Sequence, residues 1–439
     1  MMQTYFRELS QKMFQLIAGN EIILLNYAGE DSDFVRLNHN KIRQAGYVRQ
    51  QDLDIDLIIG QKQTSAALQL SGNHESDMTQ VKTLLNLMRD QIEFLPDDPY
   101  INISTEINNT ETLQENQLPD PNLVLNDVIN TTKNLDLVGI WASGSMARGF
   151  ANSLGQFNWH TNHNFNFDWS IYHHDDKAIK QNYAGFKWDH DYLNQKIAFA
   201  RETLSVLEKP AISIKPGQYR VFLAPSAMQE LISMLNWGGF GLKNHRTLQT
   251  PLLKMINEKQ TMHPHVSLFE NTREGVTPPF TKAGFLKPDS ISLISKGEYN
   301  HCMVSPRSGK EYDQAVNCSS EYAESLELSG GNLHQDHILE KLDTGIFISN
   351  LWYCNFSDRN ACRITGMTRF ACLWVENGKP VAPLNVMRFD ESIYNILGNN
   401  LVDLTTEHEH ILDSGSYHQR SQSSSRLPGA LVNDFRFTL

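Results

Sequence analysis

Runs of alternating apolar and polar residues predict strands along most of this chain, with amphipathic helices between them. In residues 1–95 the pattern indicates a helix at 5–17, a meander of short strands, and a helix at 77–92. The strands are expected at 21–27, 33–38, 44–50, 53–59 and 65–70. Because the second helix has one apolar face, we expect it to cover one face of an antiparallel sheet, which gives an α+β layer.

The middle of the chain carries the clearest strand. Residues 96–122 are rich in Pro, Asp, Asn and Glu, which is typical of a connecting segment. Residues 123–208 are expected to continue the N-terminal domain. Their helices are predicted at 123–134 and 192–207, and their strands at 137–141 and 164–172. In the last strand four large apolar residues alternate with polar ones, so one face must be buried. These residues are Phe165, Phe167, Trp169 and Ile171.

Residues 209–439 are expected to form a β-rich domain with a mostly antiparallel core, because two prolines in 209–217 mark a boundary. A strand at 219–223 and a helix at 225–236 open this domain. The helix ends at Trp237-Gly238-Gly239-Phe240.

Hairpin signals dominate the later part of this domain. Apolar strands at 346–353 and 370–375 flank a polar turn, and their segments 351–353 and 370–375 are expected in the core. Asn377-Gly378 predicts a type I′ turn, since both residues tolerate positive φ. The return strand, 381–386, contains Pro383 and directly follows Pro380, so it is expected near a sheet edge. A short helix is predicted at 390–397, with Asp390 as its N-cap.

Composition narrows the class of protein. The 439 residues are 40% hydrophobic and 20% charged, and the formal net charge of −12 argues against a general nucleic-acid binder. The longest apolar runs fall short of the roughly 18 residues of a membrane span. The N-terminus does not resemble a signal peptide. Five cysteines without a CxxC pair predict free thiols in a reducing cytoplasm.

Three short blocks follow one another along the chain. The first ends in Asn-Ser-x-Gly, the second runs from a polar loop through Gly-Met-Thr to Glu-Asn-Gly, and the third is Gly398-Asn399-Asn400-Leu401. In this order they resemble the TldD/PmbA family of metalloprotease-like proteins, some once described as modulators of DNA gyrase. The family-signature residues of the first two blocks are Asn152, Ser153, Gly155, Asp358, Gly366, Met367, Thr368, Glu376, Asn377 and Gly378.

The resemblance also implies where a zinc site would lie. Catalytic members carry His-Glu-x-x-x-His on the helix that opens the C-terminal domain, and a cysteine near the C-terminus completes the site. Here the helix contains Glu230 but no histidine, and the chain after Gly398 runs through Ser414-Gly415-Ser416 without a cysteine. The chain therefore resembles the TldE/PmbA branch, which lacks the zinc motif. We expect no catalytic residue, metal or cofactor in this chain.

The branch resemblance implies a partner and a substrate class. Its members pair with a zinc-bearing TldD-like subunit, and the assembly is a hollow peptidase that acts on small or unfolded peptides. In this chain Trp237, Gly238, Gly239 and Phe240, with the aromatic strand 164–172, are candidates for lining a peptide channel, with backbone pairing as the mode of capture.

Two other readings remain open from the residues. In the first, scattered histidines rebuild a metal site and make the chain a metallopeptidase; in the second, the chain is a non-catalytic, homodimeric peptide-binding protein. The histidine clusters are His334/His337 with Glu340, His408/His410 with Glu407, His263/His265, and His173-His174-Asp175-Asp176. Each cluster is read first as a solvated turn or a structural site.

Overall fold

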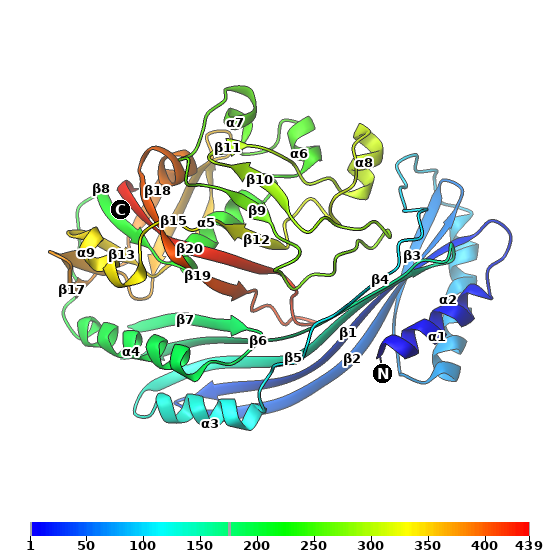
Figure 1. Cartoon of the computed structure of the whole chain (residues 1–439), viewed down its shortest axis with the longest axis horizontal. Helices are drawn as coiled ribbons and strands as arrows, with labels where there is room; N and C mark the ends of the chain where they lie inside the picture. Colours follow the sequence, from blue (N-terminus) through cyan, green and yellow to red (C-terminus); the bar gives the residue numbers. More distant parts are fainter. Residues whose placement is uncertain (1, 174–176, 439) are drawn as a thin grey trace.

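The computed structural model describes residues 2–173 and 177–438. Within them, the chain forms two sheets that lie face to face (Figure 1). The N-terminal sheet is long and curved, and the C-terminal sheet wraps around its own helix above it. No helix in these two ranges is long and apolar enough to cross a membrane.

The N-terminal sheet has the order β3-β2-β1-β5-β6-β4, with β7 also paired to β6. All pairs are antiparallel except β4 with β6. Its elements and covering helices are α1 (Met2–Phe14), β1 (Ile22–Asn38), β2 (Lys41–Ile59), β3 (Lys62–Gln69), α2 (His74–Ile92), β4 (Thr110–Leu113), α3 (Pro121–Thr131), β5 (Asp136–Asn152), β6 (Phe157–Tyr172), β7 (Ala178–Gly185) and α4 (His190–Leu207).

The prediction of five short N-terminal strands was wrong in number. The first two predicted strands are parts of β1, and the next two are parts of β2. The polar stretch at the centre of β1 stays in the ladder because it is paired on both sides. Glu30, for example, lies opposite Gln50 of β2 and Met146 of β5.

Helices cover one face of this sheet, as predicted. At one end, α1 and α2 pack apolar residues such as Phe6 and Val81 against Ile23 and Leu25 of β1. At the other end, α3 and α4 lie over the aromatic residues of β6. The opposite face is turned toward the C-terminal part of the chain (Figure 1).

The C-terminal sheet follows the order β11-β10-β9-β12-β20-β8-β13-β16-β17, and β14, β15, β18 and β19 extend it. Only β12–β20 and β8–β13 are parallel among its pairs. Its strands are β8 (Gly217–Leu223), β9 (Leu268–Glu270), β10 (Ile291–Ser295), β11 (Glu298–Tyr299), β12 (Ser325–Leu328), β13 (Gly345–Ile348), β14 (Asn350–Asp358), β15 (Arg363–Arg369), β16 (Leu373–Glu376), β17 (Lys379–Pro383), β18 (Arg388–Ser392), β19 (Leu401–Leu412) and β20 (Ser424–Phe437).

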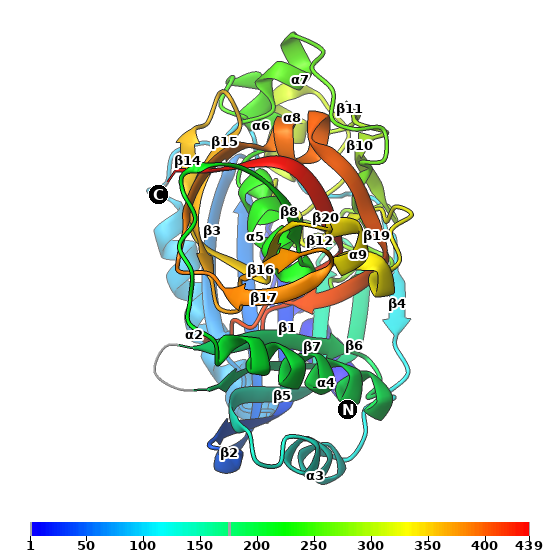
Figure 2. The ribbon, with the colours of Figure 1, turned by 90° about the vertical axis from the view of Figure 1, so that its left-hand side faces the viewer.

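One helix, α5 (Pro225–Asn236), lies inside the curve of this sheet (Figure 2). Its apolar side chains, including Met228, Leu231 and Leu235, are buried in the C-terminal core. The other helices are short and peripheral: α6 (Leu242–Arg246), α7 (Leu253–Asn257), α8 (Pro306–Tyr312), a 3₁₀ turn at Gln335–His337, α9 (Ile338–Leu342) and a π-helical turn at Asn395–Asn399. The architecture confirms the predicted α+β class, with a β-rich, mostly antiparallel C-terminal part.

The Asn377-Gly378 hairpin is confirmed. Both residues have positive φ, 49° and 73°, and they join β16 to β17. The proline-containing β17 ends the main strand order. Beyond its pairing with β16, the carbonyl of Pro383 accepts a hydrogen bond from the N–H of Ile212 (2.9 Å).

Three local predictions in this region were wrong. Asp390 is not an N-cap, because it lies in β18 opposite Thr365, and strand pairing prevails over its capping preference. Trp352 and Tyr353 were expected in the core but are 46% and 76% exposed. A register shift after Trp352 and a φ of 58° at Tyr353 turn this part of β14 outward. The strand expected at 370–375 begins only at Leu373.

Candidate functional site

The two faces of β6 have opposite characters, and both are largely buried. Phe165, Phe167 and Ile171 pack into the core under α3 and α4. The apolar side chains of the strand that was expected to line a peptide channel therefore belong to the core. The alternate residues point toward the C-terminal part, where the Asn162 amide donates to the carbonyl of Val276 (2.8 Å) and the Asn166 amide to that of Leu412 (3.3 Å).

The segment that joins β19 to β20, residues 413–423, binds to this polar face. Arg420 is buried there and donates from Nη2 to the carbonyl oxygen (3.2 Å) and the side-chain oxygen of Asn164. Its Nη1 donates to Ser32 Oγ (3.3 Å), and its backbone N–H donates to Glu30 Oε2 (3.3 Å). One residue thus binds both β1 and β6.

Neighbouring residues extend this contact. Gln50 donates to the carbonyl of His418 (2.7 Å), and Gln419 donates to Asp52 (2.6 Å). Arg148 Nη2 donates to Gln419 Oε1 (3.3 Å). Burial lowers the pKa of Arg148 to about 10, while nearby carboxylates act in the opposite direction. The 413–423 segment is therefore held on the sheet by side-chain hydrogen bonds and buried charge.

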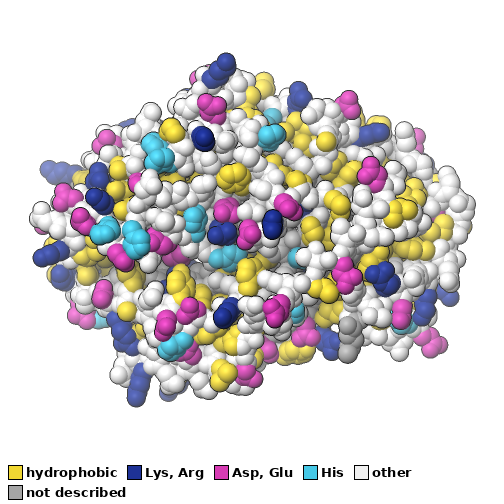
Figure 3. All heavy atoms as spheres, in the orientation of Figure 1, with side chains coloured by type: hydrophobic (Ala, Val, Ile, Leu, Met, Phe, Trp, Pro, Cys, Tyr) yellow, Lys and Arg dark blue, Asp and Glu magenta, His cyan; other side chains and the backbone are white. Residues whose placement is uncertain are grey.

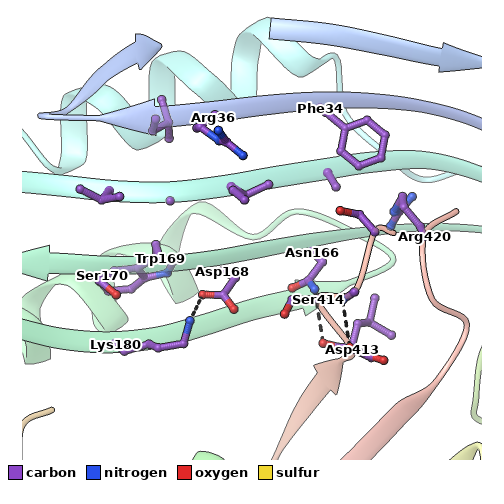
Figure 4. A pocket seen from close by; sticks show the side chains of 18 of the residues that line it. Phe34, Arg36, Asn166, Asp168, Trp169, Ser170, Lys180, Asp413, Ser414 and Arg420 are labelled. Atoms are coloured by element: carbon purple, nitrogen blue, oxygen red, sulfur yellow. Dashed lines mark hydrogen bonds and ion pairs between the residues drawn. The ribbon is translucent and has the colours of Figure 1, made fainter. Parts of the chain in front are cut away.

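Beside this contact lies a cavity of about 480 Å³ between the N-terminal sheet and residues 412–416 (Figure 4). Its floor is built from side chains of adjacent strands in register. Phe34 lies opposite Ala142, and Ala142 lies opposite Asn166. The next row places Arg36, Ile140 and Asp168 side by side, and the row beyond contains Val138, Ser170 and Lys180. The Ser414-Gly415-Ser416 stretch closes the opposite side.

Basic side chains outnumber acidic ones around the cavity. The lining includes Arg36, Arg43, Lys180 and Arg420, with Asp168 and Asp413 as its acidic groups. Lys180 forms an ion pair with Asp168 on the floor. In a chain of net charge −12, this excess of positive charge favours an anionic ligand group. Over the face of the molecule drawn in Figure 3, by contrast, acidic and basic side chains are interspersed.

Arg36 and Arg43 are not among the candidate residues that the sequence pattern indicates. The available signal was the alternation of Phe34, Arg36 and Asn38 along one strand, which places all three on one face. That pattern alone does not distinguish a cavity wall from a solvent-exposed face.

The helix α5 has no ligands for the zinc site that the resemblance implies. The side chain of Gln229 donates to Ser233 Oγ (3.2 Å), and Glu230 lies among groups that desolvate it and raise its pKa. The segment at Ser414-Gly415-Ser416 supplies hydroxyls and no thiolate. Neither α5 nor residues 414–416 therefore offers an imidazole or a thiolate, the groups that the implied zinc site uses.

The histidine clusters form pairwise contacts. His334 contacts Glu407 (3.0 Å) and His337 contacts Glu340 (2.9 Å). His408 donates to the carbonyl of Leu328 (2.9 Å).

The remaining histidine candidates are His263, His265, His410 and the group at 173–176. His263 and His265 rings lie 4.7 Å apart, whereas His174, Asp175 and Asp176 lie outside the described residues. Burial lowers the pKa of His410 to about 4. Across ranges 2–173 and 177–438, no three His, Cys, Asp or Glu side chains are placed to hold a metal ion together.

The Asn-Ser-x-Gly block closes the β5–β6 hairpin. Asn152 is buried, and its Oδ1 accepts hydrogen bonds from the N–H groups of Leu154 (3.1 Å) and Gln156 (3.0 Å). Ser153 Oγ accepts from the N–H of Ile23 (3.1 Å), which ties the turn to β1. Gly155 has a φ of 105°, which side chains disfavour.

The C-terminal signature residues also have structural contacts. Asp358 accepts a hydrogen bond from the Ala361 N–H (3.1 Å) in the β14–β15 turn, and Thr368 Oγ1 accepts one from the N–H of Met387 (2.9 Å). A Cβ at Gly366 would lie 2.8 Å from the ring of Phe389.

The rest of this signature lies near the surface. Met367 is partly buried, and the side chain of Glu376 accepts a hydrogen bond from Trp374 Nε1 (2.7 Å). The Asn377 N–H contacts Thr344 Oγ1 (3.3 Å), and the Gly378 N–H donates to the carbonyl of Asp343 (2.7 Å).

The segment predicted to contact peptide, Trp237 to Phe240, is divided between surface and core. Trp237 is 56% exposed, and Phe240 is fully buried. Arg359 donates to the carbonyl of Trp237 (2.7 Å) and lies over its ring. Gly238 has a φ of 76°, and a Cβ at Gly239 would lie 2.1 Å from the carbonyl oxygen of Leu235. These glycines allow the chain to turn closely at the end of α5, and the cavity described above does not include them.

All five cysteines are free thiols: Cys302, Cys318, Cys354, Cys362 and Cys372. Burial raises the pKa of each. For Cys354 and Cys362 the pKa reaches about 12. Because the thiolate is the nucleophile, raised pKa values favour a packing role.

Comparison with known families decides the relationship. A sequence model of the PmbA/TldA metallopeptidase C-terminal domain matches residues 216–439, just over half of the chain. The chain belongs to the TldD/PmbA family. No curated protein matches it.

Solved structures of this family share the fold. TldE from Thermococcus kodakarensis has a TM-score of 0.76 at 13% identity, with 99% of this chain and 100% of that chain covered. Two proteins named for a proposed role as modulators of DNA gyrase are similar as well. The one from Thermotoga maritima has a TM-score of 0.75 at 12% identity, covering 99% of this chain and 100% of its own. The one from Bacteroides thetaiotaomicron has 0.75 at 14% identity, covering 100% of both chains.

Proposed function

We propose that this TldD/PmbA-family chain is a TldE-like subunit without a zinc site. In this proposal it assembles in the cytoplasm with a zinc-bearing relative into a peptidase for small or unfolded peptides. The observation that carries the proposal is the makeup of α5: Gln229, Glu230 and Ser233 offer no imidazole on the helix that opens the C-terminal part. The resemblance to a solved TldE in fold supports it.

The chain supplies binding surface in this proposal. The cavity of about 480 Å³ has a size typical of small-ligand sites, and a folded domain does not fit into it. Its floor offers amides, hydroxyls and charged groups in register, which suit the polar backbone of an extended peptide. The zinc-bearing relative supplies the metal-bound water that hydrolysis requires.

Metal content tests the first half of the proposal. We expect elemental analysis of the purified chain to find far less than one zinc per chain. About one tightly bound zinc, lost when His334 or His408 is replaced by alanine, would instead support a rebuilt metallopeptidase.

Native co-purification tests the second half. A tag on this chain should recover a relative that bears His-Glu-x-x-x-His, in a defined ratio. Recovery of only its own copies would contradict the subunit role and support a homodimeric peptide-binding protein.

A further inference from the structure

Two arginines at the cavity stand out because no described acidic group neutralises them. Arg36 and Arg43 are exposed and line the cavity, and neither side chain takes part in an ion pair or hydrogen bond with the described residues. The other cations differ: Lys180 is paired with Asp168, and Arg420 is hydrogen-bonded to Asn164 and Ser32.

A register shift places the two arginines next to each other. Arg36 lies opposite Gln44, and Leu37 lies opposite Ile42, so Arg43 is the extra residue of a bulge between these pairs. A bulge redirects the side chain of its extra residue. Two neighbouring like charges on one sheet repel each other unless an anion lies between them.

An apolar surface lies directly beside this pair. Ile140 is opposite Arg36 in register and is 43% exposed, although it lies in β5 at the centre of the sheet. Phe34, two residues before Arg36, lies on the same face and also lines the cavity (Figure 4). A ligand that suits this part of the cavity has an anionic group and an apolar group separated by about the length of one amino-acid residue.

We propose that the cavity binds the carboxyl-terminal end of a short peptide. The α-carboxylate lies between Arg36 and Arg43, and the last side chain packs on Ile140 and Phe34. Guanidinium groups suit a carboxylate because they donate two parallel hydrogen bonds to it. The proposal rests on the proposed function, since it names the feature by which this chain recognises the peptide.

Binding to the full chain tests the inference. The probe is a fluorescently labelled, unstructured eight-residue peptide that ends in leucine, prepared with a free carboxylate and as the C-terminal amide. Fluorescence anisotropy should show the amide binding about tenfold to a hundredfold more weakly, which is the range for losing charge-assisted hydrogen bonds.

Variants assign the effect to the arginines. In Arg36→Gln/Arg43→Gln the acid and amide peptides should bind equally. The matched control, Arg246→Gln, changes an exposed arginine of α6 outside the cavity and should retain the preference. Since all three arginines are exposed, the variants are expected to fold.

Three results would overturn the inference. They are equal binding of acid and amide to the unmodified chain, absence of binding by the acid peptide, and an amide peptide with an internal aspartate that binds as tightly as the acid. The last result would assign the arginines to acidic side chains. None of these outcomes depends on assembly with a zinc-bearing relative. The subunit proposal is tested separately, by native co-purification.

Discussion

Arg420 and Asn164 join the two halves of the molecule. The guanidinium of Arg420, between β19 and β20, donates to both oxygens of Asn164 in β6. The two residues are 256 positions apart in the chain. This contact holds the 413–423 segment over the sheet and so positions one wall of the cavity.

Replacing Arg420 by alanine should destabilise the fold by about 3 kcal/mol, because the carboxylate of the buried Glu30 then loses a neighbouring cation. Chemical denaturation followed by tryptophan fluorescence measures this change. The double variant Glu30→Gln/Arg420→Met removes both charges and should be less destabilised than Arg420→Ala. Alanine at the exposed Arg246 is the control, within about 0.5 kcal/mol of the unmodified chain. Equal stability of Arg420→Ala and the control would show that the buried contact is not stabilising.

Stability should depend on pH through Glu270. Burial raises its pKa to about 7, although the N–H of Ser325 donates to its carboxylate (2.8 Å). The folded state therefore holds this proton more tightly than the unfolded state. The stabilisation is fully present below the unfolded pKa near 4.5 and is lost as pH rises through about 7.

The variant Glu270→Gln keeps an acceptor for Ser325 and cannot ionise. Its stability relative to the unmodified chain should increase by about 3 kcal/mol between pH 4 and pH 8. Denaturation curves of both proteins at several pH values measure this difference. A constant difference across that range would mean that Glu270 does not titrate with a raised pKa.

A side chain at the signature glycine Gly366 should destabilise the fold. A Cβ there would lie 2.8 Å from Phe389 and 2.9 Å from Cys354 Sγ, so Gly366→Ala should cost about 1–3 kcal/mol by overpacking. Gly46 offers a matched control in β2, because a Cβ there meets no atom within 4 Å. Thermal unfolding should show a lower melting temperature for Gly366→Ala, and an unchanged melting temperature for the control Gly46→Ala. Similar melting temperatures for the two variants would contradict close packing as the reason for this glycine.

Local chemistry made parts of the fold predictable. The Asn377-Gly378 turn follows from the positive φ that both residues tolerate, and the buried face of β6 follows from period-two alternation. Features set by distant partners were not predictable. The Asp390 position is decided by its pairing with Thr365, and the outward turn of Tyr353 by a bulge.

Of the candidate site, the sequence alone shows only which residue types are missing from two segments. The histidine-free helix and the serine stretch at 414–416 are visible in the printed residues, whereas the cavity requires β1, β5, β6 and residues 412–416 in one place. The polar residues of β6 illustrate the difficulty. The alternation of Asn162 and Asn166 with apolar residues is typical of a solvent-exposed face. In the structure both are buried, and their amides donate to carbonyl groups of residues more than a hundred positions away in the chain.

The most direct measurement of the central claim is the cleavage of an unstructured peptide by three samples: this chain alone, a zinc-bearing relative from the same organism alone, and their mixture. The account predicts no cleavage by this chain alone and chelator-sensitive cleavage by the mixture, above that of the relative alone. Robust, chelator-sensitive cleavage by this chain alone, or a relative whose activity and assembly are unchanged by its presence, would contradict the account.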